Sequence, residues 1–230
     1  MTDWFAGEVA TRYDDSTAGM PVEAAVDFLE PFSHGGALEL AIGTGRIAVP
    51  LAARGVRVAG VDFSPDMVAQ LRQKTREIPV AIGDMSATRV DGTFSLAYIV
   101  FNSINNVITQ DGQAATFTNA AAHLVPGGCF VVEVGVPNTQ RLEVFDLSDT
   151  HVGVDELDFA TQRLVSHHFT LRDGVWERLS VPFRSVSPAE LDLMARLAGL
   201  ELRERWADWG RSPFTAESTK HVSVWGKPSG

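Results

Sequence analysis

Apolar runs and amphipathic segments alternate along most of the 230-residue chain. Short apolar runs bounded by turn residues predict strands, and the segments between them predict helices. The first five predicted strands cover residues 35–42, 56–62, 79–84, 94–102 and 129–137. Because strands and helices alternate, the pattern predicts an α/β fold, with a mostly parallel sheet, right-handed crossovers and helices on both faces.

Serine–proline pairs support two of the predicted helices. Ser64 and Ser187 each precede a proline, so each stands as an N-cap before a proline at the first helical position. Residues 1–33 are predicted to form an N-terminal helical segment. The later predicted helices cover residues 44–55, 64–77, 111–124 and 187–199.

The pattern changes between residues 150 and 186, where β-branched and aromatic residues alternate with polar ones. The triplet Arg-Asp-Gly at 172–174 is a hairpin signal, so this stretch predicts an antiparallel β insertion. Two further strands are predicted at 200–206 and 220–227. We therefore expect one domain over residues 1–230 that carries this insertion.

Composition excludes several classes of function. The formal net charge is −10, and no cluster of Lys and Arg offsets it locally, so nucleic acid is a poor candidate partner. The single cysteine, Cys129, lies in an apolar run and is expected to be buried and unreactive. No apolar run reaches the roughly 20 residues of a membrane helix. No signal peptide is visible either, and we expect a cytoplasmic protein without membrane contact.

The stretch Gly-Thr-Gly-Arg-Ile-Ala, residues 43–48, follows the first strand and fits a dinucleotide-binding turn. That motif alone is a weak signal. Carboxylates at the ends of three successive strands change its interpretation: Glu39, Asp62 and Asp84. Carboxylates would sit poorly beside a pyrophosphate. They suit a ligand that joins an adenosine to a cationic group, with one carboxylate on the ribose hydroxyls.

Four motifs in order resemble those of class I S-adenosylmethionine-dependent methyltransferases. They are LELAIGTGR, VAGVDFSPDMV, IGDM and LVPGG, and the resemblance covers about residues 9–135. It implies a Rossmann-like sheet of seven strands whose last strand, at 220–227, is antiparallel to the rest. One departure is Ala41, where the family often has a glycine.

The resemblance also implies S-adenosyl-L-methionine as cofactor and S-adenosyl-L-homocysteine as product. It assigns the methionine part to the first strand and its loop, with a tyrosine near the carboxylate and an aromatic ring beside the sulfonium: Glu39, Ala41, Gly43, Gly45, Tyr13 and Phe101. It assigns the ribose and adenine to the ends of the second and third strands and the helix between them: Asp62, Phe63, Met67, Asp84 and Met85.

The methyl acceptor is expected to be a small molecule that is methylated on N or O. Residues 101–106 lack the proline-rich signature of the methyltransferases that act on nucleic-acid amino groups. Asn102 and Asn106 offer neutral hydrogen bonds instead. Trp4, Trp209 and Arg211 are candidates for the acceptor wall, although such aromatics equally suit the sealing of a sheet edge. The insertion resembles, in layout, that of small natural-product and deoxyaminosugar N-methyltransferases.

Candidates for a catalytic base are few. His167 and His168 are adjacent on a predicted strand, so at most one of them points inward. Glu133 lies inside the fifth strand. The sequence contains no spaced ligand set for a metal, and methyl transfer by in-line displacement requires none. Two alternatives stay open, namely an NAD(P)-dependent oxidoreductase and a non-catalytic cofactor-binding protein. The oligomeric state also stays open, with a homodimer as one option.

Overall fold

The computed structural model describes residues 2–137 and 140–229. Its main sheet has seven strands in the order β10-β11-β5-β4-β1-β2-β3. The strands are β1 (Ala37–Leu40), β2 (Val58–Asp62), β3 (Val80–Ile82), β4 (Phe94–Ile99), β5 (Leu124–Gly135), β10 (Glu201–Trp206) and β11 (Lys220–Gly226). The pairs β1–β2, β1–β4, β2–β3 and β4–β5 are parallel, and β11 is antiparallel to both of its neighbours. The predicted Rossmann-like sheet with an antiparallel last strand is therefore confirmed.

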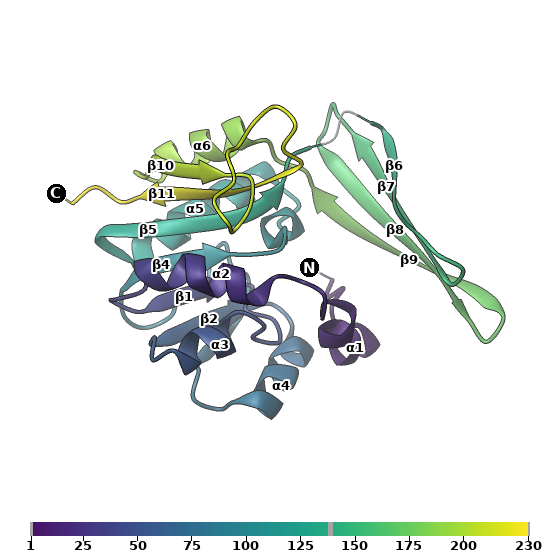
Figure 1. The fold of residues 1–230 in the computed structure, drawn as a ribbon, viewed down its shortest axis with the longest axis horizontal. Helices are drawn as coiled ribbons and strands as arrows, with labels where there is room; N and C mark the ends of the chain where they lie inside the picture. The colour runs from purple at the N-terminus through teal and green to yellow at the C-terminus, as the bar shows by residue number, and fades with distance from the viewer. Residues whose placement is uncertain (1, 138–139, 230) are drawn as a thin grey trace.

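Helices cover both faces of this sheet, as predicted (Figure 1). Side chains of α2 (Val22–Leu29), α3 (Ala48–Ala53) and α4 (Pro65–Lys74) join the apolar core of one face. Side chains of α5 (Gln110–His123) and α6 (Pro188–Leu197) join the core of the other. There Phe117 lies edge-on to both Phe130 and Trp225, with ring centroids 4.9 and 5.3 Å away. These edge-to-face aromatic contacts fix how α5 sits on the sheet.

Local capping explains where two helices begin. The Ser64 hydroxyl accepts a hydrogen bond from the Met67 amide, and the Ser187 hydroxyl accepts one from the Glu190 amide. Both predicted N-caps are thus confirmed. The helix predicted over 44–55 begins later, at Ala48, because residues 43–47 form the loop after β1. Among the described residues, no helix combines the length and apolar content needed to cross a bilayer.

A second sheet of four antiparallel strands projects from one side of the main sheet (Figure 1). Its strands are β6 (Leu142–Leu147), β7 (His151–Asp158), β8 (Arg163–Arg172) and β9 (Val175–Arg184), and we call residues 142–184 the flap. The predicted hairpin is present, because Asp173 and Gly174 both have the positive φ that such a turn requires.

The predicted start of the insertion at residue 150 was wrong, because β6 was missed. This strand has no clean alternation of buried and exposed positions, and its apolar side chains are largely exposed. Strand pairing with β7, which a single sequence does not display, makes residues 142–147 a strand.

The N-terminal segment completes the architecture beside the flap. It holds α1 (Glu8–Ser16), and Gly7 just before this helix donates a backbone hydrogen bond to Asp66 of α4. Arg172 of β8 lies 2.6 Å from the Glu8 carboxylate. This ion pair joins the N-terminal segment to the flap. These two segments are distant in sequence, and both line the cavity described below. The short 3-10 helices η1 (Glu30–Phe32) and η2 (Ser103–Asn106) join the remaining elements.

A buried arginine connects the flap to the main domain. The Arg184 guanidinium, at the end of β9, donates to Gln113 of α5 at 2.5 Å and to Glu190 of α6 at 2.7 Å. It also donates to Gln162 of the flap at 2.5 Å. The side chains of Arg184 and Glu190 are only 7% and 13% exposed. Because the two charges pair with each other and are also bonded by side-chain amides, including that of Gln110 on Glu190, the base of the flap has one preferred orientation.

Replacing this arginine should destabilise the protein. We expect Arg184→Met to lower the free energy of unfolding by about 3–5 kcal/mol, because it leaves the Glu190 charge buried without its partner. Chemical denaturation measures this loss. Arg178→Met, at an exposed position of the same strand, is the matched control and should change stability by less than about 0.5 kcal/mol. Equal effects of the two variants would contradict the role given to Arg184.

Candidate active site

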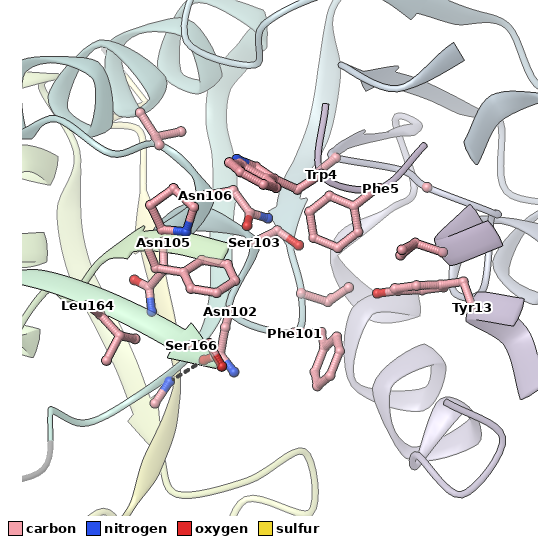
Figure 2. Close-up of a pocket in the computed structure, with 18 of the residues that line it drawn as sticks. Trp4, Phe5, Tyr13, Phe101, Asn102, Ser103, Asn105, Asn106, Leu164 and Ser166 are labelled. Carbon is pink, nitrogen blue, oxygen red and sulfur yellow. Dashed lines mark hydrogen bonds between the residues drawn. The ribbon is translucent and has the colours of Figure 1, made fainter. Parts of the chain in front are cut away.

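A cavity of about 1260 Å³ opens where the parallel strands end, between the main sheet, the N-terminal segment and the flap. Figure 2 shows Trp4 and Phe5 facing the asparagine-rich end of β4, with Leu164 and Ser166 of the flap at one side. A site for one drug-sized ligand occupies about 300–1,000 Å³. The cavity therefore has room for two small molecules side by side.

The backbone around the end of β1 and β4 adopts conformations that side chains rarely take. Ala41 has φ 62°, and Phe101 and Asn102 have φ 53° and 59°. Each such non-glycine residue carries strain of about 1–3 kcal/mol, which occurs mainly at functional sites. Ala41 thus keeps the left-handed conformation that glycine would adopt freely. A side chain on Gly45 would collide with Leu71 at 2.3 Å, so this glycine serves close packing behind the cavity.

Asp62 joins the end of β2 to the loop that follows β1. Its carboxylate accepts backbone hydrogen bonds from Gly43 at 2.6 Å and from Ser64 at 2.8 Å. Burial raises the pKa of Asp62, and these two hydrogen bonds act in the opposite direction. The carboxylate also lines the cavity, where its remaining lone pairs can accept hydrogen bonds from hydroxyl groups.

Glu39 is a buried carboxyl group that faces the same cavity. The Tyr98 hydroxyl donates a hydrogen bond to it at 2.9 Å. Burial raises the pKa of Glu39 to about 8, although this hydrogen bond lowers it. A cationic ligand beside Glu39 would favour the ionised form. The site therefore suits a ligand with a positive charge near the end of β1.

Arg46 is a lining residue that we did not predict. Among the described residues that line the cavity, it is the only Arg or Lys. Its guanidinium lies 5.5 Å from the centre of the Phe101 ring. It lies near Tyr13 as well, where it lowers a phenol pKa that burial raises. The only feature of the sequence that could have indicated this role is the position of Arg46 inside the loop motif, directly after the second glycine.

The flap supplies one wall of the cavity through alternate positions of its strands. His151, Asp155 and Leu157 of β7 line the cavity, as do Leu164, Ser166 and His168 of β8. This two-residue period is the one expected for a strand. Glu143, Phe145 and Asp146 of β6 belong to the same wall. Of these residues only His168 was among the predicted site residues, because β6 and the inward face of the flap were not recognisable from the sequence.

Comparison with known proteins places the fold and the cavity in a family. A family model described as a methyltransferase domain matches residues 37–128. The solved structure of the CcbJ methyltransferase from Streptomyces caelestis is 34% identical, with a TM-score of 0.86 and coverage of 99% of this chain and 100% of that one. The chain belongs to the S-adenosylmethionine-dependent methyltransferases. The methyltransferase therefore uses S-adenosyl-L-methionine, and the oxidoreductase alternative finds no support.

Two curated relatives are also methyltransferases. The cypemycin N-terminal methyltransferase from a Streptomyces species is 28% identical over 217 residues, which are 90% of this chain and 89% of that protein. The dTDP-3-amino-3,4,6-trideoxy-alpha-D-glucopyranose N,N-dimethyltransferase of Streptomyces venezuelae is 30% identical over 156 residues. That match spans 66% of this chain and 62% of the relative.

Most of the predicted site residues of the methyltransferase meet in the cavity. Tyr13 and Phe101 lie on one side of it (Figure 2), and Asp84 at the end of β3 binds the Ser86 amide at 2.8 Å. The other predicted residues that line the cavity are Trp4, Glu39, Ala41, Gly43, Asp62, Phe63, Met67, Met85, Asn102, Asn106 and His168. Asn102 uses its side-chain oxygen to hold the Gly135 amide at 2.6 Å.

The structure does not bring Trp209 and Arg211 to the cavity. Trp209 is 6% exposed and packs edge-on against Phe28 of α2, with ring centroids 5.3 Å apart. The Arg211 guanidinium lies 5.0 Å from the centre of the same Phe28 ring. Their prediction as acceptor-binding residues was wrong, because burial of the indole against α2 gives these residues a packing role instead.

Two predicted bases also lie outside the described lining. His167 points to the opposite face of β8, where its ring binds the Ser180 hydroxyl at 2.8 Å. Glu133 accepts a hydrogen bond from the Phe101 amide at 3.0 Å and so fixes the chain after β4. Gly45, a predicted cofactor-binding residue, also lies outside the described lining and packs against Leu71 instead. Placing His167 and Glu133 among the catalytic candidates was therefore wrong, whereas the expectation that at most one of the paired histidines faces inward is confirmed.

Glu39 should make the stability of the methyltransferase depend on pH. Its carboxyl has an ordinary pKa of 4.5 when unfolded and about 8 when folded. The stabilising contribution is therefore complete below about pH 4.5 and is lost as the pH rises toward about 8. The side chain introduced by Glu39→Gln stays neutral throughout. Relative to the wild type, the free energy of unfolding of Glu39→Gln should therefore rise by more than about 2 kcal/mol over this window, since one pKa unit corresponds to about 1.4 kcal/mol.

Denaturation of both proteins at pH 5, 6.5 and 8 measures this difference in the free energy of unfolding. Glu201→Gln, at an exposed position of β10, is the control and should track the wild type at all three pH values. A constant difference between Glu39→Gln and the wild type would show that Glu39 ionises at its ordinary pKa.

Proposed function

We propose that the methyltransferase transfers a methyl group to the amine nitrogen of a small molecule that carries no phosphate. The observation that supports this is the charge of the cavity wall. Glu143, Asp146 and Asp155 of the flap line it together with two histidines, and no Lys or Arg of the described flap does so. A diphosphate is normally bound by Arg, Lys or clustered backbone amides.

The relatives are consistent with nitrogen as the acceptor atom. Two of them are described as N-terminal and N,N-dimethyl transferases, of a peptide and of a nucleotide-linked amino sugar. The acidic wall favours the first kind of acceptor, an amine without a nucleotide. A protonated amine would be attracted to the carboxylates and guided to the cavity.

Within this proposal the cofactor lies along the ends of β1 to β4. Arg46 pairs with its carboxylate beside Tyr13, and Glu39 faces its cationic methionine part. Asp62 accepts hydrogen bonds from the ribose hydroxyls, and Asp84 with Met85 holds the adenine. The backbone at Ala41 and Gly43 lets the ligand approach closely. Phe63, Met67 and Phe101 supply apolar contact.

The cofactor supplies an activated methyl on a positive sulfur. The residues of this chain then have to align the amine, exclude water and accept a proton. Trp4 and Phe5 close one side of the cavity, and Asn106 offers a hydrogen bond to the acceptor. The flap holds the acceptor on the opposite side.

The role of Arg46 is tested by calorimetry. We expect Arg46→Met to weaken the binding of S-adenosylmethionine and of S-adenosylhomocysteine by a similar factor of about ten to a hundred. Both ligands carry the same carboxylate, and hydrogen bonds to charged groups contribute about 1.5–3 kcal/mol. Arg76→Met, at an exposed position after α4, should bind both ligands as the wild type does. Unchanged binding by Arg46→Met would place the carboxylate elsewhere.

The acceptor class is tested with a panel of defined compounds. The panel holds a free 3-amino-3-deoxy sugar, its dTDP conjugate, the same sugar with hydroxyl in place of amine, and the dipeptide Ala-Ala amide. We expect methylation of the free amines, and weak or no turnover of the dTDP conjugate and the hydroxyl compound. Mass spectrometry of the products and initial rates measure this.

Two outcomes would contradict the proposed function. One is preference for the dTDP conjugate, which would show that the cavity binds a diphosphate despite its acidic wall. The other is O-methylation of the hydroxyl sugar. Thymidine diphosphate alone serves as a control and should not compete with either free amine.

A further inference from the structure

Four polar side chains of the flap form one continuous chain of hydrogen bonds along the cavity wall. The Asp146 carboxylate lies 2.6 Å from His151 Nδ1. His151 Nε2 lies 3.2 Å from His168 Nδ1, and His168 Nε2 lies 3.3 Å from the Ser166 hydroxyl. All four residues line the cavity. The side chains of His151 and Asp146 are 25% and 50% exposed, so the outer end of the chain meets water.

The Asp146 carboxylate fixes the direction of both imidazole hydrogens in this chain when both rings are neutral. An ionised Asp146 only accepts, so His151 carries its hydrogen on Nδ1 and presents a lone pair at Nε2. His168 must then carry its hydrogen on Nδ1 to donate to that lone pair. The remaining nitrogen, His168 Nε2, is left as an acceptor beside the Ser166 hydroxyl, whose single hydrogen can go to this nitrogen or to the Asp155 carboxylate. The chain therefore presents a basic nitrogen beside Ser166 and directs its hydrogens outward.

Packing holds the two rings in this arrangement. Gly153 lies opposite His168 in the ladder between β7 and β8. A side chain at Gly153 would meet the Phe145 ring at 2.3 Å, so the glycine lets that ring lie across the strand. Phe145 contacts His168 edge-on at 5.4 Å, and the His151 ring centroid is also 5.4 Å from that of His168. The apolar ring therefore shields the inner imidazole.

The other charged groups near His168 are few. Asp155 of β7 faces it from the same wall, and one of the Asp155 carboxylate oxygens is buried without a hydrogen-bond partner. His167 lies on the opposite face of β8. Burial and the neighbouring His151 lower the pKa of His168, whereas Asp155 and Asp146 raise it. The net direction is downward, which keeps His168 neutral and able to accept a proton near pH 7.

We propose that His168 Nε2 accepts a proton from the acceptor amine and that His151 and Asp146 pass a proton on to solvent. This inference rests on the proposed function and names its base. A protonated amine gives one proton to His168 Nε2, His168 Nδ1 releases its own to His151 Nε2, and His151 Nδ1 releases its own to Asp146. Asp146 then releases that proton to water, and proton exchange of the two imidazoles with water returns them from the Nε2-protonated to the resting Nδ1-protonated forms.

The freed amine lone pair forms the new N–C bond. The C–S bond breaks at the same time, and its electron pair goes to sulfur, which becomes a neutral thioether. The product is an alkylammonium ion that leaves in that form or loses a proton by the same route. His168 is the catalytic residue in this scheme, and His151 and Asp146 are positioning residues.

The tautomers predicted for the chain can be measured without any acceptor. In ¹⁵N-labelled protein at pH 8, long-range ¹H–¹⁵N correlation should show His151 and His168 both protonated on Nδ1. His151→Gln and His168→Gln assign the signals. Asp146→Asn should weaken the preference of His151 for the Nδ1 form. An Nε2-protonated form of either ring in the wild type would overturn the relay, whatever the acceptor is.

Kinetics with the free amino sugar and Ala-Ala amide test the base. We expect His168→Gln to lower kcat about a hundredfold or more at pH 7 with little change in KM, since a general base contributes about 10²–10⁴. His151→Gln and Asp146→Asn should lower kcat about tenfold. His167→Gln is the matched control, one residue away on the opposite face, and should keep kcat within about twofold.

The pH profile separates proton transfer from a structural role. The loss in His168→Gln should shrink as the pH rises toward the pKa of the acceptor amine, because the amine then arrives neutral. A loss that is constant with pH, or a His168→Gln variant as active as His167→Gln, would overturn the proposal. If neither free amine is methylated, the proposed function fails, and the tautomer measurement still decides whether the hydrogen-bond chain exists as described.

Discussion

The hydrogen bond between the Asp62 carboxylate and the Gly43 amide is the contact on which the sheet side of the cavity depends. It ties the loop after β1 to the end of β2, so two adjacent strand ends act as one rigid edge. Glu39 lies just inside this edge, and burial raises its pKa to about 8. The free protein keeps this carboxyl largely neutral near pH 7, and a cationic ligand beside it would favour its ionised form. Affinity for such a ligand is therefore built into the sheet itself.

The acceptor half depends on a different kind of constraint. The flap belongs to a separate sheet, and the buried Arg184 fixes its base against α5 and α6. Most of the flap lies away from this root, and its strands carry many exposed apolar and charged residues. Its inward face can therefore change without disturbing the parallel sheet. Because the two parts of the cavity are built differently, the lining residues of the sheet edge could be predicted from the sequence, whereas most of those of the flap could not.

The fold and the carboxylates at the sheet edge of the cavity could be predicted because local patterns encode them. Apolar runs gave the parallel strands, serine–proline pairs gave two helix starts, and carboxylates at strand ends marked the edge where they meet. The acceptor side could not be predicted in the same way. Trp209 and Arg211 looked like binding residues, but only tertiary packing against Phe28 shows their role. Likewise, β6 becomes a strand through pairing with β7. The pairing of β7 with β8 is what brings His151 beside His168.

The ion pair between Glu8 and Arg172 has a consequence for the order in which the cavity forms. Its two partners are 164 positions apart in the chain. The strand ends of the main sheet that line the cavity come from one continuous stretch, whereas its closing walls come from the first few residues and from the flap. Contacts of such long sequence separation form late, because their loop closure costs entropy before any contact is gained. A nascent chain can therefore form the sheet edge of the cavity well before the cavity is enclosed.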